Sequence, residues 1–284
     1  MKHYVWLLFF IIPFSFYSCE NNHISYENQW GDVFKKYGID SACFELVDNN
    51  HDIVHVYNLE RASKRFSPAS TFKIMNSLIA LETSTAPDEK FIIKWDGQQR
   101  NAEWDKDMDM REAFNVSNVY YFQELAKKIG KISMQKYLDT IRYGNKNIGN
   151  SIEQFWLNDS LKITADEQVG FIKKLYFDKL PMSQRTQRIV RSMLLKEDEQ
   201  GYKLYYKTGT KEVIENNQKH LMAWLVGYAE RKETQKTIME GKEETNYKPY
   251  FFAMNFDSNE SIEKTSEIRL SILKEILKQQ RILP

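Results

Sequence analysis

The chain has 284 residues, 42% of them hydrophobic, which is enough to bury a large core in one big domain or two interleaved ones. Its 40 basic and 39 acidic residues leave a net charge of +1, and no long basic stripe runs along it. The charge pattern therefore argues against a nucleic-acid partner and favours small or neutral partners.

The N-terminus resembles an export signal. A basic start precedes an apolar run over residues 4–17, which is too short to span a bilayer. The run ends in "FYSC", where a small residue before Cys19 resembles a bacterial lipobox, with Phe16 where leucine is commoner. We expect a lipoprotein-type signal peptide over residues 1–18 and an exported, periplasmic or membrane-anchored protein lipidated at Cys19. A plain signal peptide cut nearby is the alternative.

Two strands are expected next. Residues 39–47 and 53–58 predict a hairpin around "DNNHD". Cys43 lies in its first strand and is expected to be a buried small hydrophobe rather than a nucleophile. His51 and His55 are four residues apart, but their segment is strand-like and no further ligand motif accompanies them. We therefore expect no metal site.

The middle of the chain is expected to be helical. A helix is predicted to begin at Ser67, with Ser67 as its N-cap and Pro68 in the first helical position. The pattern stays mostly helical to about residue 195, and "TADEQVGFIKKLY" opens on a capping box between Thr164 and Glu167.

Strands return after Gly201, in "YKLYYKTG", "HLMAWLVGYAE" and "PYFFAMNFD". The charged segment 231–248 is expected to be a solvated hairpin extension. A final helix carries one apolar face, made of Ile268, Ile272, Leu273, Ile276 and Leu277.

Strands at both ends with helices between them predict an α+β fold, in which helices flank an antiparallel sheet and an all-helical subdomain is inserted. After the signal, the expected parts are an N-terminal tether over 19–28, the first part of the sheet subdomain over 29–66, a mainly helical subdomain over 67–200, and the second part of the sheet with the C-terminal helix over 201–284.

The pattern S-x-x-K occurs four times, so context must choose among the matches. Only Ser70 with Lys73 lies just inside a predicted helix N-terminus, where backbone N–H groups can stabilise a developing oxyanion. Only there does the lysine lie in an apolar helix, where an ammonium costs several kcal/mol unless it is paired or loses its proton. In the other three matches the lysine is expected to be a solvent-exposed charge on a helix. These are Ser133 with Lys136, Ser261 with Lys264, and Ser271 with Lys274.

Two further motifs follow Ser70 and Lys73 along the chain. These are "SNV" over 117–119 and a single "KTG" over 207–209, at the end of a predicted strand. A helix-borne S-x-x-K, a serine triplet and a strand-borne K-T-G, in this order, are typical of penicillin-recognising serine enzymes.

Over nearly all of the mature chain the sequence resembles the class D serine β-lactamases, the oxacillinase type. The triplet ends in Val119, as in class D, whereas class A enzymes and most transpeptidases have asparagine there. Two residues depart from the family pattern: Tyr120 after the triplet and Thr210 after "KTG". Further matching stretches are "FSPASTFKIMNSLIALE", "WDG", "YGN", "FWL", "EQVGFIKKL", "AWLVGY" and "FAMNFD".

The resemblance implies the serine β-lactamase fold and a set of catalytic roles. Ser70 would be the nucleophile. Lys73, converted by carbon dioxide to N6-carboxylysine, would be the general base for acylation and deacylation, with no other cofactor. Trp156 would donate its indole N–H to this group, and Ser117 with Lys207 would deliver a proton to the leaving nitrogen.

The resemblance also implies how the substrate is held. Thr208 and Arg269 would bind its carboxylate, and Gly209 belongs to the same motif. The backbone N–H groups of Ser70 and Thr210 would form the oxyanion hole. Apolar walls are expected from Val119 and Leu157.

These expectations add up to hydrolysis of the β-lactam amide of penicillin-type antibiotics, and so to antibiotic resistance. One alternative is a β-lactam sensor domain that stays acylated, although such receptors carry several membrane spans. A second is a cell-wall DD-peptidase or transpeptidase, against which Val119 argues.

Overall fold

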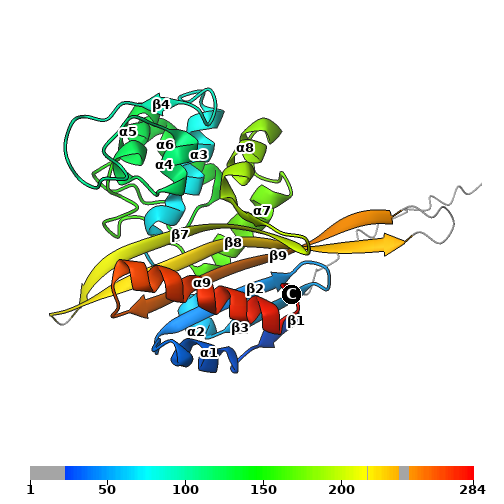
Figure 1. The fold of residues 1–284 in the computed structure, drawn as a ribbon. Coiled ribbons are helices and arrows are strands. Elements are labelled where there is room, and N and C mark those ends of the chain that lie inside the picture. The colour runs from blue at the N-terminus through cyan, green and yellow to red at the C-terminus, as the bar shows by residue number, and fades with distance from the viewer. Residues whose placement is uncertain (1–22, 216, 237–242) are drawn as a thin grey trace, which may run out of the picture.

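A computed structural model describes residues 23–215, 217–236 and 243–284. Its centre is a seven-stranded sheet in the order β1-β3-β2-β9-β8-β7-β6, in which β1 and β3 are parallel and the other described neighbours antiparallel (Figure 1). The strands of this sheet are β1 (His23–Tyr26), β2 (Ala42–Asp48), β3 (Ile53–Tyr57), β6 (Leu195–Asp198), β7 (Tyr202–Glu215), β8 (Gln218–Lys236) and β9 (Glu243–Ser258).

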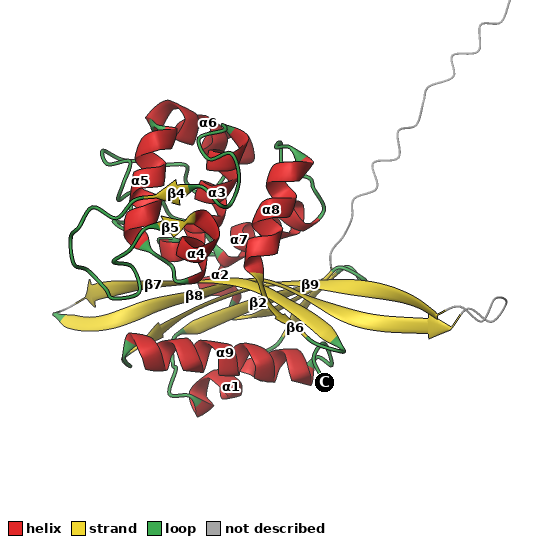
Figure 2. Cartoon of the chain, turned by 45° about the horizontal axis from the view of Figure 1, so that its top comes forward, coloured by secondary structure: helices red, strands yellow, loops and turns green. Residues whose placement is uncertain are grey.

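Helices cover both faces of the sheet. Figure 2 shows α1 and α9 on one face and the larger helical layer on the other. That layer also holds a short hairpin of β4 (Ile92–Ile93) and β5 (Met108–Asp109). The helices are α1 (Trp30–Lys36), α2 (Leu59–Ala62), the 3-10 turn η1 (Ala69–Phe72), α3 (Lys73–Glu82), α4 (Met110–Asn115), α5 (Val119–Ile129), α6 (Lys131–Ile141), α7 (Ala165–Tyr176), α8 (Gln184–Leu194) and α9 (Ile262–Gln279).

Apolar side chains of one strand point alternately to the two faces of the sheet, which explains why both faces are buried. In β9, Phe252, Met254 and Phe256 pack in the core with α1 and α9, whereas Phe251 and Ala253 belong to the core under the helical layer. Successive side chains of a strand point to opposite faces, so "PYFFAMNFD" supplies apolar groups to two cores at once.

Several sequence predictions are confirmed. The predicted hairpin is β2 paired antiparallel with β3. Thr164 and Glu167 form the capping box of α7, and the predicted apolar face of α9 is buried. The segment 231–248 extends the sheet as paired strands over the described residues on either side of 237–242. Cys43 is fully buried, and burial raises the pKa of its thiol to about 12.

Two predictions need correction, and the prediction for the N-terminus concerns residues outside the described ranges. Residues 23–26 of the expected tether form β1, which pairs with β3 at the edge of the sheet. Residues 195–198 of the expected helical part form β6. The signal peptide over 1–18 and the lipidation of Cys19 lie outside the described residues and stay predictions. Among the described helices, none is long and apolar enough to cross a membrane.

Candidate active site

Ser70 lies on the 3-10 turn η1, which leads directly into α3. The predicted N-cap role of Ser67 is wrong, because its Oγ instead donates to the carbonyl oxygen of Trp156 at 2.7 Å. Pro68 precedes the turn rather than opening an α-helix. The N–H of Ala69 also donates to the Trp156 carbonyl, at 3.1 Å, and Ala69 has a φ of +47°, which is uncommon for a residue with a Cβ. Two bonds to one carbonyl thus fix the strained turn that carries Ser70.

Lys73 is the first residue of α3 and has no exposed surface. Its Nζ lies 2.6 Å from Ser70 Oγ and 3.3 Å from Ser117 Oγ. The ring of Phe122 lies below the amine, 5.6 Å from Nζ to the ring centroid. Burial lowers the pKa of Lys73 to about 7, because desolvation disfavours the ammonium.

Ser117 links the two lysines of the motifs. It lies between α4 and α5 with a φ of +58°, and its Oγ accepts a hydrogen bond from Lys207 Nζ at 3.0 Å. Lys207 is buried on β7, and its pKa is well below the ordinary value, first through desolvation and then through the charges of Lys73, Lys196 and Arg269. A chain of hydrogen bonds therefore runs from Ser70 through Lys73 and Ser117 to Lys207.

Gly209 allows strand β7 to lie against the turn of the nucleophile. A Cβ at this position would stand 2.9 Å from the carbonyl oxygen of Pro68 and 3.2 Å from the backbone nitrogen of Thr71. Both neighbours are backbone atoms, so the contact can be relieved only if β7 and η1 move apart. Glycine at this point of "KTG" therefore fixes the distance between the two halves of the site.

The substitution Gly209→Ala should lower the free energy of unfolding by about 1–3 kcal/mol, because it overpacks this contact. Chemical denaturation followed by circular dichroism measures the change. Gly201→Ala is the matched control, since a Cβ there meets nothing within 4 Å. Equal stabilities for the two variants would show that β7 and η1 are not in tight contact.

Trp156 closes the site behind Phe72, with the two rings stacked at 5.4 Å between centroids. The side chain is 1% exposed, and its Nε1–H has no hydrogen-bond partner among the described residues. A buried N–H without an acceptor is costly, and indole can only donate. Trp156 therefore presents an unused donor in a dry environment.

Arg269 is placed differently from the prediction of a direct substrate contact. It is 2% exposed on α9, and its Nη1 donates to the carbonyl oxygens of Gly209 and Trp224, both at 2.9 Å. Nη1 also lies 3.3 Å from Thr210 Oγ1, while Nη2 donates to Ser266 Oγ. The guanidinium thus binds the backbone of β7 and β8 from inside the protein.

The remaining predicted residues are half-buried around this centre. Thr208 and Thr210 follow along β7, Val119 opens α5, and Leu157 packs against the core next to Trp156. The structure gives no contact that joins Val119 or Leu157 to Lys73, so their role as apolar walls stays a prediction.

Some residues of the site were not found from the sequence. Gln168 on α7 donates to Thr71 Oγ1 at 2.8 Å and so supports the nucleophile turn from below. The ring of Phe114 lies 5.6 Å from Lys207 Nζ. Lys196 lines a cavity of about 250 Å³ beside Lys207 and Thr208. Only the position of Gln168 inside the matching stretch "EQVGFIKKL" could have pointed to it.

Comparison with known proteins identifies the family of the chain. The family model of the penicillin-binding protein transpeptidase domain matches residues 28–278. The chain is 40% identical to β-lactamase OXA-48 of Klebsiella pneumoniae over 80% of this chain and 78% of that protein. It is 37% identical to β-lactamase OXA-10 of Pseudomonas aeruginosa over 92% and 91%.

Solved structures give the same result. The class D β-lactamase YbXI from Nostoc is 34% identical and superposes with a TM-score of 0.79 over 90% of this chain and all of that one. The class D β-lactamase FUS-1 (OXA-85) from Fusobacterium nucleatum subsp. polymorphum is 31% identical, with a TM-score of 0.79 over 92% and 100%. Since the family model matches residues 28–278 and the likeness to class D β-lactamases in sequence and fold covers most of the chain, this chain belongs to the class D serine β-lactamases, within the penicillin-binding transpeptidase family.

Proposed function

We propose that this chain hydrolyses the β-lactam amide of penicillin-type antibiotics through an acyl-enzyme on Ser70, and so confers resistance to them. The observation that carries the proposal is the 2.6 Å contact between Ser70 Oγ and a fully buried Lys73 whose pKa is lowered to about 7. At neutral pH a large share of Lys73 is then uncharged and can take a proton. The relatives named β-lactamases support the same reaction class.

In the acylation half, the base on residue 73 takes the proton of Ser70 Oγ. The oxygen then forms a bond to the lactam carbonyl carbon, and the C–N bond of the ring breaks. The developing oxyanion would accept hydrogen bonds from the backbone N–H groups of Ser70 and Thr210.

The departing ring nitrogen needs a proton, and Ser117 would give it. Its Oγ can replace the lost proton from Lys207 Nζ, which lies 3.0 Å away. The lowered pKa of Lys207 makes the ammonium a better acid than an exposed lysine. The serine thus serves as a relay between the lysine and the leaving group.

We further propose that Lys73 works as N6-carboxylysine. The uncharged amine would bond through Nζ to the carbon of carbon dioxide and release one proton, and the product supplies a carboxylate-like base. The unused Nε1–H of Trp156 fits such an oxygen-rich group in a dry pocket. Lys73 in this form would also take a proton from the water that attacks the acyl carbon, after which Ser70 leaves with a proton restored to its Oγ.

The substrate carboxylate would bind beside Thr208, in the cavity that Lys207 and Lys196 also line. Arg269 would contribute through the Thr210 hydroxyl and the carbonyl of Gly209 that it holds, rather than by a bidentate contact of its own. Val119 and Leu157 would limit the entry of water.

Turnover of a penicillin tests the proposal. With the purified enzyme we expect many molecules hydrolysed per protein, together with a transient mass increase on Ser70 equal to the penicillin. A single stoichiometric burst followed by a lasting adduct would instead favour the sensor alternative. No adduct and no hydrolysis would contradict both.

A further inference from the structure

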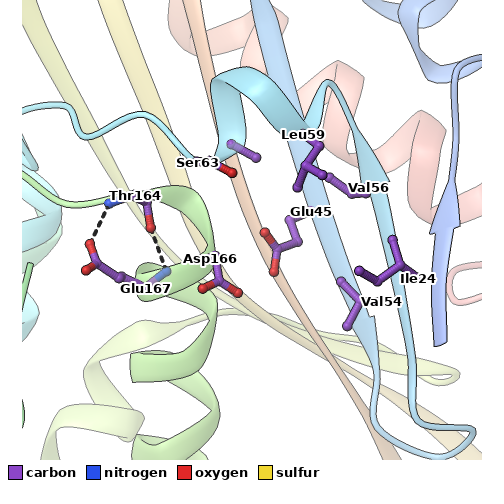
Figure 3. A pocket seen from close by; sticks show the side chains of 10 residues that line it. Ile24, Glu45, Val54, Val56, Leu59, Ser63, Thr164, Asp166 and Glu167 are labelled. Carbon is purple, nitrogen blue, oxygen red and sulfur yellow. Dashed lines mark hydrogen bonds between the residues drawn. The ribbon is translucent and has the colours of Figure 1, made fainter. Parts of the chain in front are cut away.

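A second cavity, of about 520 Å³, lies between the edge of the sheet and the first turn of α7 (Figure 3). None of the proposed catalytic residues lines it. Its lining consists of Ile24, Glu45, Val54, Val56, Leu59, Ala62, Ser63, Thr164, Asp166 and Glu167. The cavity is therefore separate from the Ser70 site.

Glu45 is the unusual residue of this cavity. It lies in the middle of β2, between Val56 and Ala253 on the neighbouring strands, and is only 3% exposed. Among the described residues, no basic side chain lines the cavity beside its carboxyl group, whose side-chain hydrogen bond is with the carboxyl group of Asp166. A buried carboxylate without a cationic partner is expensive, and burial raises the pKa of Glu45 to about 8.

Asp166 faces Glu45 from α7. Figure 3 shows the two carboxyl groups pointing toward each other across the cavity, and the charge of Asp166 adds to the raised pKa of Glu45. Asp166 itself is exposed, so the cavity opens to solvent on that side.

The other charges around the cavity do not neutralise this pair. Glu167 is already engaged, because it accepts from the Thr164 backbone N–H at 3.0 Å and pairs with Arg65. The neighbours of Glu45 on β3, β9 and α2 are apolar, and no basic side chain lines the cavity in the described part of the chain. The site thus has a net negative charge with no cation of its own.

The remaining walls are apolar and partly open. Ile24 is 54% exposed and Leu59 is 42% exposed, although both border the cavity. Within the described residues no group of three or more His, Cys, Asp or Glu side chains is placed to hold a metal ion. Two facing carboxyl groups beside apolar walls suit an organic cation better than a hydrated metal, which needs more oxygen ligands.

We propose that this cavity binds a small organic cation, whose amidinium or ammonium group lies between Glu45 and Asp166 and whose apolar part packs against Ile24, Val54 and Leu59. A planar cation with two parallel N–H groups can meet both carboxylates by charge-assisted hydrogen bonds. Without a ligand, Glu45 keeps its proton at neutral pH, and the cation replaces this proton on binding.

Binding of benzamidinium, measured by isothermal titration calorimetry on the full enzyme, tests the proposal. The charge of benzamidinium is constant from pH 7 to pH 9, whereas Glu45 loses its proton over this range. We therefore expect the affinity to rise about tenfold from pH 7 to pH 9, given the pKa of about 8. Benzamide, the uncharged analogue, should bind at least tenfold more weakly.

Variants locate the binding site. Glu45→Gln and Asp166→Asn, which keep the shape of each side chain, should each weaken benzamidinium at least tenfold, and Glu45→Gln should abolish the pH dependence. Ser70→Ala should bind benzamidinium as the unaltered enzyme does, which excludes the catalytic site. Circular dichroism confirms that each variant is folded. No binding at pH 9, or equal binding by folded Glu45→Gln, would overturn the proposal.

Discussion

We expect Lys73→Met to lower kcat/KM for a penicillin by roughly 10² to 10⁴, the usual contribution of a positioned general base. Methionine keeps the length and apolar stem of the side chain but cannot take the proton of Ser70 Oγ, now 2.6 Å from Nζ. Steady-state kinetics measure the loss, and mass spectrometry should then find at most slow acylation of Ser70. An unchanged kcat/KM would remove Lys73 from the mechanism.

In buffer free of carbon dioxide, where Lys73 is the unmodified amine, the same variant should be more stable than the unaltered enzyme at pH 7. The folded chain holds Lys73 with a pKa of about 7, against an ordinary value of 10.5, so the unfolded chain binds the extra proton between these pH values. The enzyme's free energy of unfolding therefore rises with pH from about 7 to 10.5, and this contribution is absent from Lys73→Met.

The gain in the free energy of unfolding from Lys73→Met is largest at or below pH 7, at up to about 5 kcal/mol, and vanishes above pH 10.5. Denaturant titrations at several pH values measure it. Lys264→Met is the matched control, because Lys264 belongs to another S-x-x-K match and its side chain is 57% exposed. If the free energy of unfolding depends on pH in the same way for Lys73→Met and the unaltered enzyme, the site does not lower the pKa of Lys73.

The motifs at Ser70, Ser117 and Lys207 were predictable because each is local and carries a distinct chemistry. The sequence also predicted that the apolar surroundings of Lys73 would lower its pKa, and the structure supplies the buried position that does so. The segment "PYFFAMNFD" was likewise predicted as a strand, and it forms part of β9.

Long-range contacts account for what the sequence did not show. Ser67 looked like an N-cap, but its hydroxyl donates a hydrogen bond to the carbonyl oxygen of Trp156, 89 positions away. Arg269 matched a substrate-binding position, yet Nη1 of its guanidinium donates to carbonyls of β7 and β8. Glu45 lies in a predicted strand and carries no motif, and only the packing of α7 against β2 brings Asp166 opposite it. Such pairings depend on tertiary packing, which local patterns do not encode.

Trp156→Phe should lower kcat by about 10- to 100-fold, because it removes one N–H donor to a charged group, worth about 1.5–3 kcal/mol. Phenylalanine keeps an aromatic ring to stack on Phe72. If the donor holds the carboxylated form of Lys73, the variant should also need more bicarbonate. After degassing below pH 7, both enzymes should lose activity, and added bicarbonate should restore it at a higher concentration in Trp156→Phe.

Trp30→Phe separates this effect from a general loss of packing. The Nε1–H of Trp30 is also buried without a partner among the described residues, but it lies in the core on the opposite face of the sheet. Trp30→Phe should therefore change stability and leave both kcat and the bicarbonate requirement as they are. The carboxylation proposal fails if the degassed enzyme is indifferent to bicarbonate, or if Trp156→Phe and Trp30→Phe respond to it alike. Both variants remove a buried indole N–H without a partner among the described residues, so a bicarbonate requirement that changes only in Trp156→Phe would support the proposed contact between this N–H and carboxylated Lys73.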